Sequence, residues 1–189
     1  MSMDYWVALS DSEREHWGFV PGEIVGPLNF GMTERAVFDT MAGRGFTGSQ
    51  DEVERWNTAR MQWRITFHKA EADRWNRPAV KCYFVEGVGL TCVLLDGLRG
   101  PQVTHEGIPL IGRVPSELSQ DIEAYATRKN IGIRFNHASD ILYDGMDTMI
   151  NRGAQRAGDT VVTWAVFFNL GEIAGTSWDI LPADVWHHG

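Results

Sequence analysis

Apolar residues recur at helical spacing in two segments that carry clear start and stop signals. The first predicted helix begins after Thr33, whose hydroxyl can cap it, and ends near Gly43 and Gly45, which suit a left-handed C-terminal residue. The second has Pro115 in its first turn and ends by Asn130. Each helix therefore has one apolar face, formed by Ala36, Val37, Met41 and marginally Phe38 in the first, and by Leu118, Ile122 and Tyr125 or Ala126 in the second.

A capping box predicts a further helix between these two. Ser49 is followed three residues later by Glu52, and the apolar Val53, Trp56 and Trp63 lie near one another on the predicted helix face. Three arginines fall largely beside or opposite that face: Arg55, Arg60 and Arg64. We therefore expect a helix from Ser49 to Trp63, ending before the β-branched run that follows it.

Strand-forming residues dominate the remaining sequence, with Gly, Asn and Asp as turn signals. A hairpin is predicted in which Val80–Val85 pairs with Gly89–Leu95, followed by a short strand at Gln102–His105. A three-residue loop would place Cys82 opposite Cys92, close enough to oxidise in air, although we expect two thiols in the cytosol. Four more strand candidates lie in GIRFN, ILYDG, DTMINRG and TVVTWAVFFN.

One motif occurs twice along the chain. GPLNFGMTERAV at 26–37 and IPLIGRVPSEL at 108–118 align on Gly31 and Gly112, and each precedes strand-rich sequence. The alignment places Phe30 on Ile111, Val37 on Leu118 and Met41 on Ile122. We predict a single compact domain over 1–189, of the α+β class, with helices packed on one face of an antiparallel sheet. Related halves at 19–105 and 106–189 would explain the recurrence, and chance repetition of a common pattern is the alternative.

Charge is distributed unevenly. The net charge of −8 argues against binding to duplex nucleic acid, yet the segment from Arg55 to Lys81 holds seven basic and only two acidic residues. Tryptophan and arginine are the residue types most enriched at binding hot spots. We therefore predict a protein-binding face formed by Arg60, Trp63, Arg64, Trp75 and Arg77. The alternative is that the arginines cover core tryptophans with their aliphatic stems.

Catalytic and metal-binding patterns are weak in this sequence. The six histidines are scattered without H-x-x-x-H or C-x-x-C spacing, and there is no G-x-S-x-G elbow and no phosphate-binding glycine loop. We therefore expect no metal, no cofactor and no catalytic residues. The longest apolar run falls short of a membrane span, and the first residues do not resemble a secretory signal, so we expect a cytoplasmic protein.

The turn-helix motif GPLNFGMTERAV resembles the opening of small α/β modules such as the repeats of the beta-lactamase inhibitor protein and the lipoprotein that assists outer-membrane barrel assembly. Those modules pack helices on an antiparallel sheet and act by binding other proteins. The chain departs from them in three respects: we expect no signal peptide, it has no lipobox cysteine, and a long Trp-rich helix is predicted as an insertion at Ser49 to Trp63. The resemblance implies a non-catalytic protein-binding domain, of the inhibitor or immunity type, whose partner is another protein. A small enzyme or a small-ligand-binding protein with a pocket between its halves is the alternative.

Overall fold

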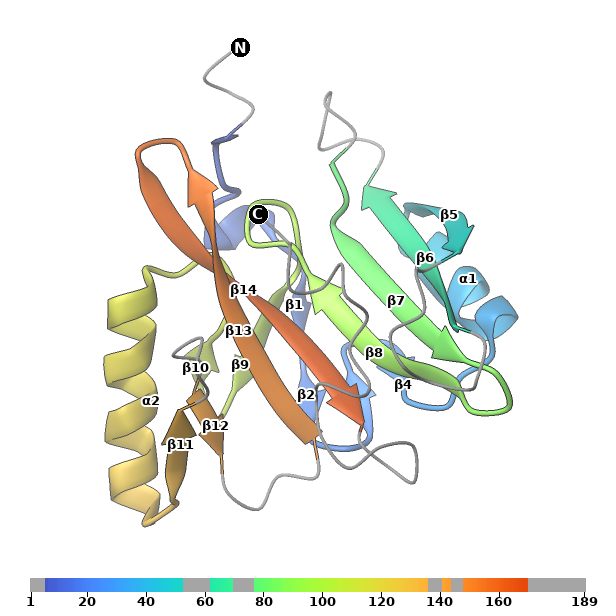
Figure 1. Ribbon diagram of the computed structural model, residues 1–189. Coiled ribbons are helices and arrows are strands. Elements are labelled where there is room, and N and C mark those ends of the chain that lie inside the picture. Colours follow the sequence, from blue (N-terminus) through green and yellow to red (C-terminus); the bar gives the residue numbers. More distant parts are fainter. Residues whose placement is uncertain (1–5, 53–61, 70–76, 136–140, 144–147, 170–189) are drawn as a thin grey trace.

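A six-stranded antiparallel sheet forms the centre of the molecule (Figure 1). The computed structural model describes residues 6–52, 62–69, 77–135, 141–143 and 148–169. Within them the sheet has the order β13-β14-β8-β7-β6-β5. These strands are β5 (Phe46–Glu52), β6 (Gln62–Lys69), β7 (Val80–Val85), β8 (Gly89–Leu95), β13 (Thr148–Ala157) and β14 (Thr160–Asn169).

Two helices cover one face of this sheet. α1 (Glu34–Ala42) and α2 (Pro115–Lys129) lie at opposite ends of that face, and their buried side chains belong to the same core cluster. Two small sheets lie between the helices: β1 (His16–Trp17), β9 (Gln102–His105) and β10 (Ile108–Pro109) form one, and β2 (Phe19–Val20), β3 (Ile24–Val25) and β4 (Leu28–Asn29) form the other. A last pair joins β11 (Ile133–Phe135) to β12 (Ile141–Tyr143), and Asp11–Glu13 form a short 3-10 turn. The predicted α+β class, with helices on one face, is confirmed.

Both helices begin and end at their predicted signals. The Thr33 hydroxyl accepts a hydrogen bond from the Ala36 amide at 3.3 Å, which satisfies one of the first amides of α1. Pro115 is the first residue of α2, and Asn130 ends it in the left-handed conformation with φ 56°. Most of the predicted apolar positions are buried, namely Val37 and Met41 in α1, and Leu118, Ile122, Tyr125 and Ala126 in α2, whereas Ala36 and Phe38 are half-buried.

The predicted helix from Ser49 to Trp63 is wrong at both of its ends. Ser49 lies in β5 and Trp63 in β6, which pair antiparallel, while 53–61 lie outside the described residues. Gly48 shows how tightly β5 packs in the core, because a Cβ atom there would come within 2.7 Å of the rings of both Phe38 and Phe67. Tertiary packing therefore overrides the local capping signal.

The hairpin of β7 and β8 has the predicted bounds, but the predicted cysteine pairing is wrong. The pairs next to the turn, including Phe84 with Leu90, follow the expected register. A bulge beyond them shifts the pairing by one residue, so that Cys92 lies opposite Tyr83 instead of Cys82. The two cysteines therefore belong to separate core clusters on opposite faces of the sheet, and both are buried free thiols.

The two copies of the recurring motif are attached to the sheet in the same way. Gly31 has φ 84°, its amide donates to the Leu90 carbonyl at 2.8 Å, and the Met32 carbonyl accepts from the Leu90 amide at 2.9 Å. Gly112 has φ 71°, and the corresponding pair of bonds joins Gly112 and Arg113 to Thr163, each at 2.8 Å. Each glycine thus fixes the start of its helix to one strand of the central sheet.

These two attachment points are related by the pairing of β8 with β14. Residues 92–95 pair antiparallel with residues 165–168, and Leu90 and Thr163 each lie two positions before their paired segment. A two-fold rotation that exchanges the paired segments therefore exchanges the attachment points as well. In both parts of the chain, a β-hairpin is followed by the glycine, then by a helix and then by four strands. The second hairpin, β9 with β10, crosses the predicted boundary between 105 and 106, so the division into related halves at 19–105 and 106–189 stays a prediction.

The glycine pair gives a first test of this architecture. Gly31→Ala should lower the free energy of unfolding by about 1 to 2 kcal/mol, the cost of a left-handed non-glycine residue. Gly112→Ala should cost more, because its Cβ would also lie 2.7 Å from Arg14 Nη2, whereas at Gly31 the nearest atom is 3.8 Å away. Urea unfolding of both variants measures the difference. Equal losses would contradict the close approach of Arg14 to Gly112.

The cysteine placement gives a second test. Because Cys82 and Cys92 are fully buried on opposite faces, mild oxidation of the folded protein should leave both as thiols. Both should react with a thiol reagent only in urea. An intramolecular disulfide found by mass spectrometry after oxidation of the native protein would show that the register of β7 and β8 differs from the one described.

Candidate functional site

A surface pocket of about 210 Å³ lies where the segment before β1 meets the ends of three central strands. Its lining is amphipathic. Four cations, two carboxylates and four apolar residues contribute: Arg14, Lys69, Arg77 and Arg99; Glu13 and Glu15; and Leu9, Phe46, Ala79 and Pro101. A local excess of positive charge in a chain of net charge −8 makes this pocket the strongest candidate site.

Arg14 forms the floor of the site as a buried cation. Its guanidinium donates to the carbonyls of Gly100 at 2.5 Å, Gly97 at 2.7 Å and Leu9 at 3.2 Å. Burial lowers the pKa of Arg14 to about 10, while the nearby Asp96 acts in the opposite direction. Arg14 therefore remains charged at neutral pH and joins two backbone segments, the one at Leu9 and the turn at Gly97 and Gly100.

Asp96 holds the turn that carries Arg99. One carboxylate oxygen accepts the amides of Leu98 and Arg99, both at 2.8 Å, and the other accepts the side-chain amide of Gln155 at 3.0 Å. Gln155 in turn accepts the Gly97 amide at 2.8 Å. The turn at the end of β8 is thus hydrogen-bonded on both sides, which makes this wall of the pocket rigid before anything binds.

Glu15 places a carboxylate among the cations. It accepts hydrogen bonds from Lys69 Nζ and from Trp17 Nε1 at 3.1 Å, and it lies 3.6 Å from Arg44 Nη1. Burial alone would raise the pKa of Glu15, but the bonds from Lys69 and Trp17 and the two positive charges outweigh it and lower the pKa. The pocket therefore already holds one carboxylate in its ionised form.

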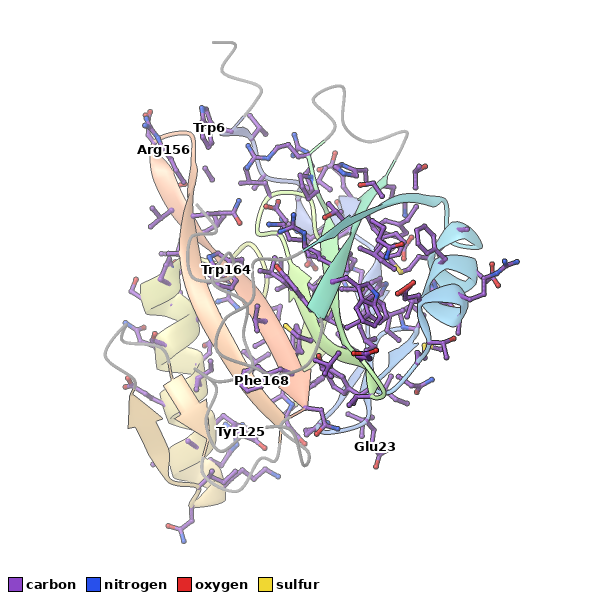
Figure 2. The ribbon with its side chains drawn as sticks, turned by 45° about the vertical axis from the view of Figure 1, so that its right-hand side comes forward. Trp6, Glu23, Tyr125, Arg156, Trp164 and Phe168 are labelled. Carbon is purple, nitrogen blue, oxygen red and sulfur yellow. The ribbon has the colours of Figure 1, made fainter. Side chains whose placement is uncertain are left out.

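The remaining cations lie against aromatic and backbone groups. Arg77 lies over the Trp6 ring, with 5.4 Å from its Cζ to the ring centroid, and Lys69 Nζ lies 5.0 Å from the centroid of Phe46. Arg99 donates to the Val7 carbonyl at 2.5 Å. Figure 2 shows Trp6 at the end of the molecule opposite to Tyr125 of α2. These contacts keep the charged groups at the rim of the pocket.

The structure separates the residues predicted as one binding face. Arg60 and Trp75 lie outside the described residues, and Arg77 lines the pocket. Trp63 stacks on Phe84 with 6.0 Å between ring centroids, on the sheet face that carries the helices. Because side chains alternate along a strand, the neighbouring Arg64 belongs to the opposite face. Trp63 is also about 20 Å along β6 from the end where the pocket lies, at about 3.3 Å per residue.

Several pocket residues were not found by sequence reasoning. Lys69 belonged to the basic segment that was singled out, so its charge was a usable signal. No sequence signal marked Arg14, Glu15 or Arg99. Arg14, for example, binds carbonyls that lie more than eighty positions away along the chain. No periodicity or motif reports such a contact.

No cluster of three or more metal-ligating side chains occurs among the described residues. Burial raises the pKa of the Cys82 thiol, which keeps it protonated and unreactive at neutral pH. None of the helices in the described part of the chain has the length and apolar character needed to cross a membrane. Comparison of the chain with protein families, with curated proteins and with solved structures gave no significant match.

The ionised state of Glu15 makes stability depend on pH. Its pKa in the folded protein lies below its ordinary value of 4.5, so its bonds to Lys69 and Trp17 stabilise the fold above that pH and are lost as the pH falls through the lowered pKa. Glu15→Gln keeps the shape and the acceptor oxygen but cannot ionise. The difference in unfolding free energy between wild type and this variant should therefore shrink from pH 7 to pH 3. A constant difference in urea unfolding across that range would contradict the ion pair.

Proposed function

We propose that this chain is a non-catalytic protein-binding domain, of the inhibitor or immunity type, that binds another protein through the surface around the basic pocket. The observation that supports it most directly is the gathering of Arg14, Lys69, Arg77 and Arg99 around one cavity in an otherwise acidic chain. Arginine beside apolar side chains, as in this amphipathic lining, is typical of protein interfaces.

The size of the pocket favours a partner side chain over a free ligand. Sites for drug-sized molecules and cofactors usually enclose about 300 to 1,000 Å³. The pocket here is smaller, at about 210 Å³. A cavity of this size suits one side chain from a larger binding surface. This argument weakens the alternative of a small-ligand-binding protein or small enzyme.

The position of the pocket also weakens the alternative of a small enzyme or small-ligand-binding protein, because that alternative places the site between the two halves. All the lining residues fall between Leu9 and Pro101, within the first half and the segment before it. The hydrogen bonds of Arg14 and Asp96 hold the walls in place, so a partner would bind without ordering them first. A rigid, preformed surface is what an occluding inhibitor requires.

The resemblance of segment 26–37 to inhibitor-type modules is part of the same proposal. Each part of the chain places one helix on an antiparallel sheet, as those modules do. We also assign the protein to the cytoplasm, where its two buried cysteines stay reduced.

Charge removal at the pocket rim tests this proposal. The double variant Lys69→Gln/Arg77→Gln and the wild type are used as baits in lysate of the native host, and captured proteins are quantified by mass spectrometry. One protein bound to wild type at a one-to-one ratio and reduced at least tenfold on the variant is the expected result, because charge-assisted bonds at interfaces are strong. A lower salt concentration should strengthen the wild-type interaction.

A matched control separates this effect from general loss of charge. Arg128→Gln/Lys129→Gln removes the same two charges from the last turn of α2, at the other end of the molecule. It should capture the partner as wild type does. If both double variants lose the partner equally, or if wild type binds no protein stoichiometrically, the pocket is not the binding surface.

A further inference from the structure

We infer that residues 170–189 cover the face of the central sheet that points away from the helices. This face does not belong to the pocket of the proposed function, because no residue that lines the pocket is part of its apolar cluster. Three observations lead to this segment: the burial of the face, the lack of a cover for it in the described part of the chain, and the position and composition of 170–189.

The side chains on this face are buried as deeply as those on the helix side. They form a separate cluster, called here the second cluster, in which no side chain is more than 5 % exposed: Tyr83, Cys92, Leu94, Trp164, Val166 and Phe168. Strands with one solvated face alternate between buried and exposed positions. β14 is instead buried without interruption from Val162 to Phe168, and β7 and β8 are buried at all but one position each. Both faces of these three strands are therefore shielded from water.

The described helices and small sheets shield only one of these two faces. Val37 of α1, Leu118 of α2, Trp17 of β1 and Val103 of β9 all belong to the cluster on the helix side (Figure 1). Every member of the second cluster comes from β7, β8 or β14. Within the described ranges, no element outside the central sheet contributes a side chain to the second cluster. Its cover therefore has to come from one of the remaining segments.

Position and length select 170–189 among those segments. It continues directly from β14, along which Figure 2 shows Trp164 and Phe168. Its twenty residues can span about 65 Å when extended, and the buried stretch of β14 is about 20 Å long. Segments 53–61 and 70–76 connect β5 to β6 and β6 to β7, and β6 lies three strand spacings, about 14 Å, from β14. Segments 136–140 and 144–147 hold only five and four residues.

The composition of 170–189 suits an apolar surface. The segment has no lysine or arginine and three carboxylates, and it contains seven large apolar residues: Leu170, Ile173, Trp178, Ile180, Leu181, Val185 and Trp186. Tryptophan side chains bury large areas and keep one polar edge that can face water. Contact with the second cluster would remove apolar area of both the segment and the sheet from water, which is the main favourable contribution to packing.

Cysteine reactivity tests this inference in the full chain. Cys92 belongs to the second cluster and Cys82 to the cluster on the helix side, and both are fully buried. Ile180→Asp would place a charge in the proposed cover and loosen it. The rate at which a thiol reagent modifies Cys92 should then rise about tenfold or more, because a buried group reacts through local opening, while Cys82 stays protected. Peptide mapping by mass spectrometry identifies the modified residue.

A matched control and a milder variant keep this test specific. Val20 is 44 % exposed in β2, so Val20→Asp adds the same charge away from the proposed contact and should leave both cysteines protected. Trp178→Ala adds no charge and should expose Cys92 selectively, although to a smaller degree. Continued protection of Cys92 in both variants of the segment, or equal exposure of the two cysteines, would overturn the inference.

A spin label separates the possible occupants of this face. Because the native thiols are buried, a nitroxide should attach selectively to Ser177→Cys. In ¹⁵N-labelled protein the amide signals of Leu94 and Val166 should lose intensity, while that of Arg35, on the exposed side of α1, keeps it. A mixture of spin-labelled protein without ¹⁵N and ¹⁵N-labelled protein without the spin label should show no loss. A loss in the mixture would assign the cover to a second copy, and no loss in either sample would assign it to another segment; both results would overturn the inference.

Discussion

The buried charge of Arg14 is the constraint on which the arrangement of this molecule depends. A guanidinium removed from water must be surrounded by acceptors, and here the carbonyls of Gly97 and Gly100 and the charge of Asp96 supply them. Arg14 Nη2 also approaches Gly112 so closely that no side chain fits there. One cation therefore fixes the segment before β1 and the turn after β8 relative to one another, and it packs closely against Gly112, which precedes α2.

That constraint has a direct consequence for the pocket. Since Arg14 is committed to backbone carbonyls, the other cations that line the pocket include Lys69, which is bound to Glu15, and Arg77, which lies over Trp6. Glu15 offsets part of their charge in the free protein. A binding site of this kind is rigid in its floor and partly neutralised at its rim. It should gain selectivity from charge and shape more than high affinity from any single contact.

Local signals predicted those parts of the fold that local interactions decide. Thr33 and Pro115 mark helix starts because a cap or a fixed φ acts within one turn. The helix predicted at Ser49 failed because the same residues pair with β6, and the cysteine register failed because a bulge depends on both strands at once. The site was predicted only at Arg77 for the same reason: its other members meet through contacts between distant segments, which no pattern in the sequence records.

The two helices are attached to the sheet in equivalent ways, but the residues that line the pocket are not shared equally between the two halves. The attachments at Gly31 and Gly112 are equivalent, so a two-fold arrangement by itself would predict two equivalent pockets. The pocket instead depends on the segment before β1, which precedes both halves and joins the fold through the parallel pairing of β1 with β9. If the halves arose by duplication, this added segment is what distinguishes them, since it supplies Arg14 and Glu15 to one end of the sheet. The proposed binding surface then combines this added segment with residues of the first half, among them Lys69 and Arg77.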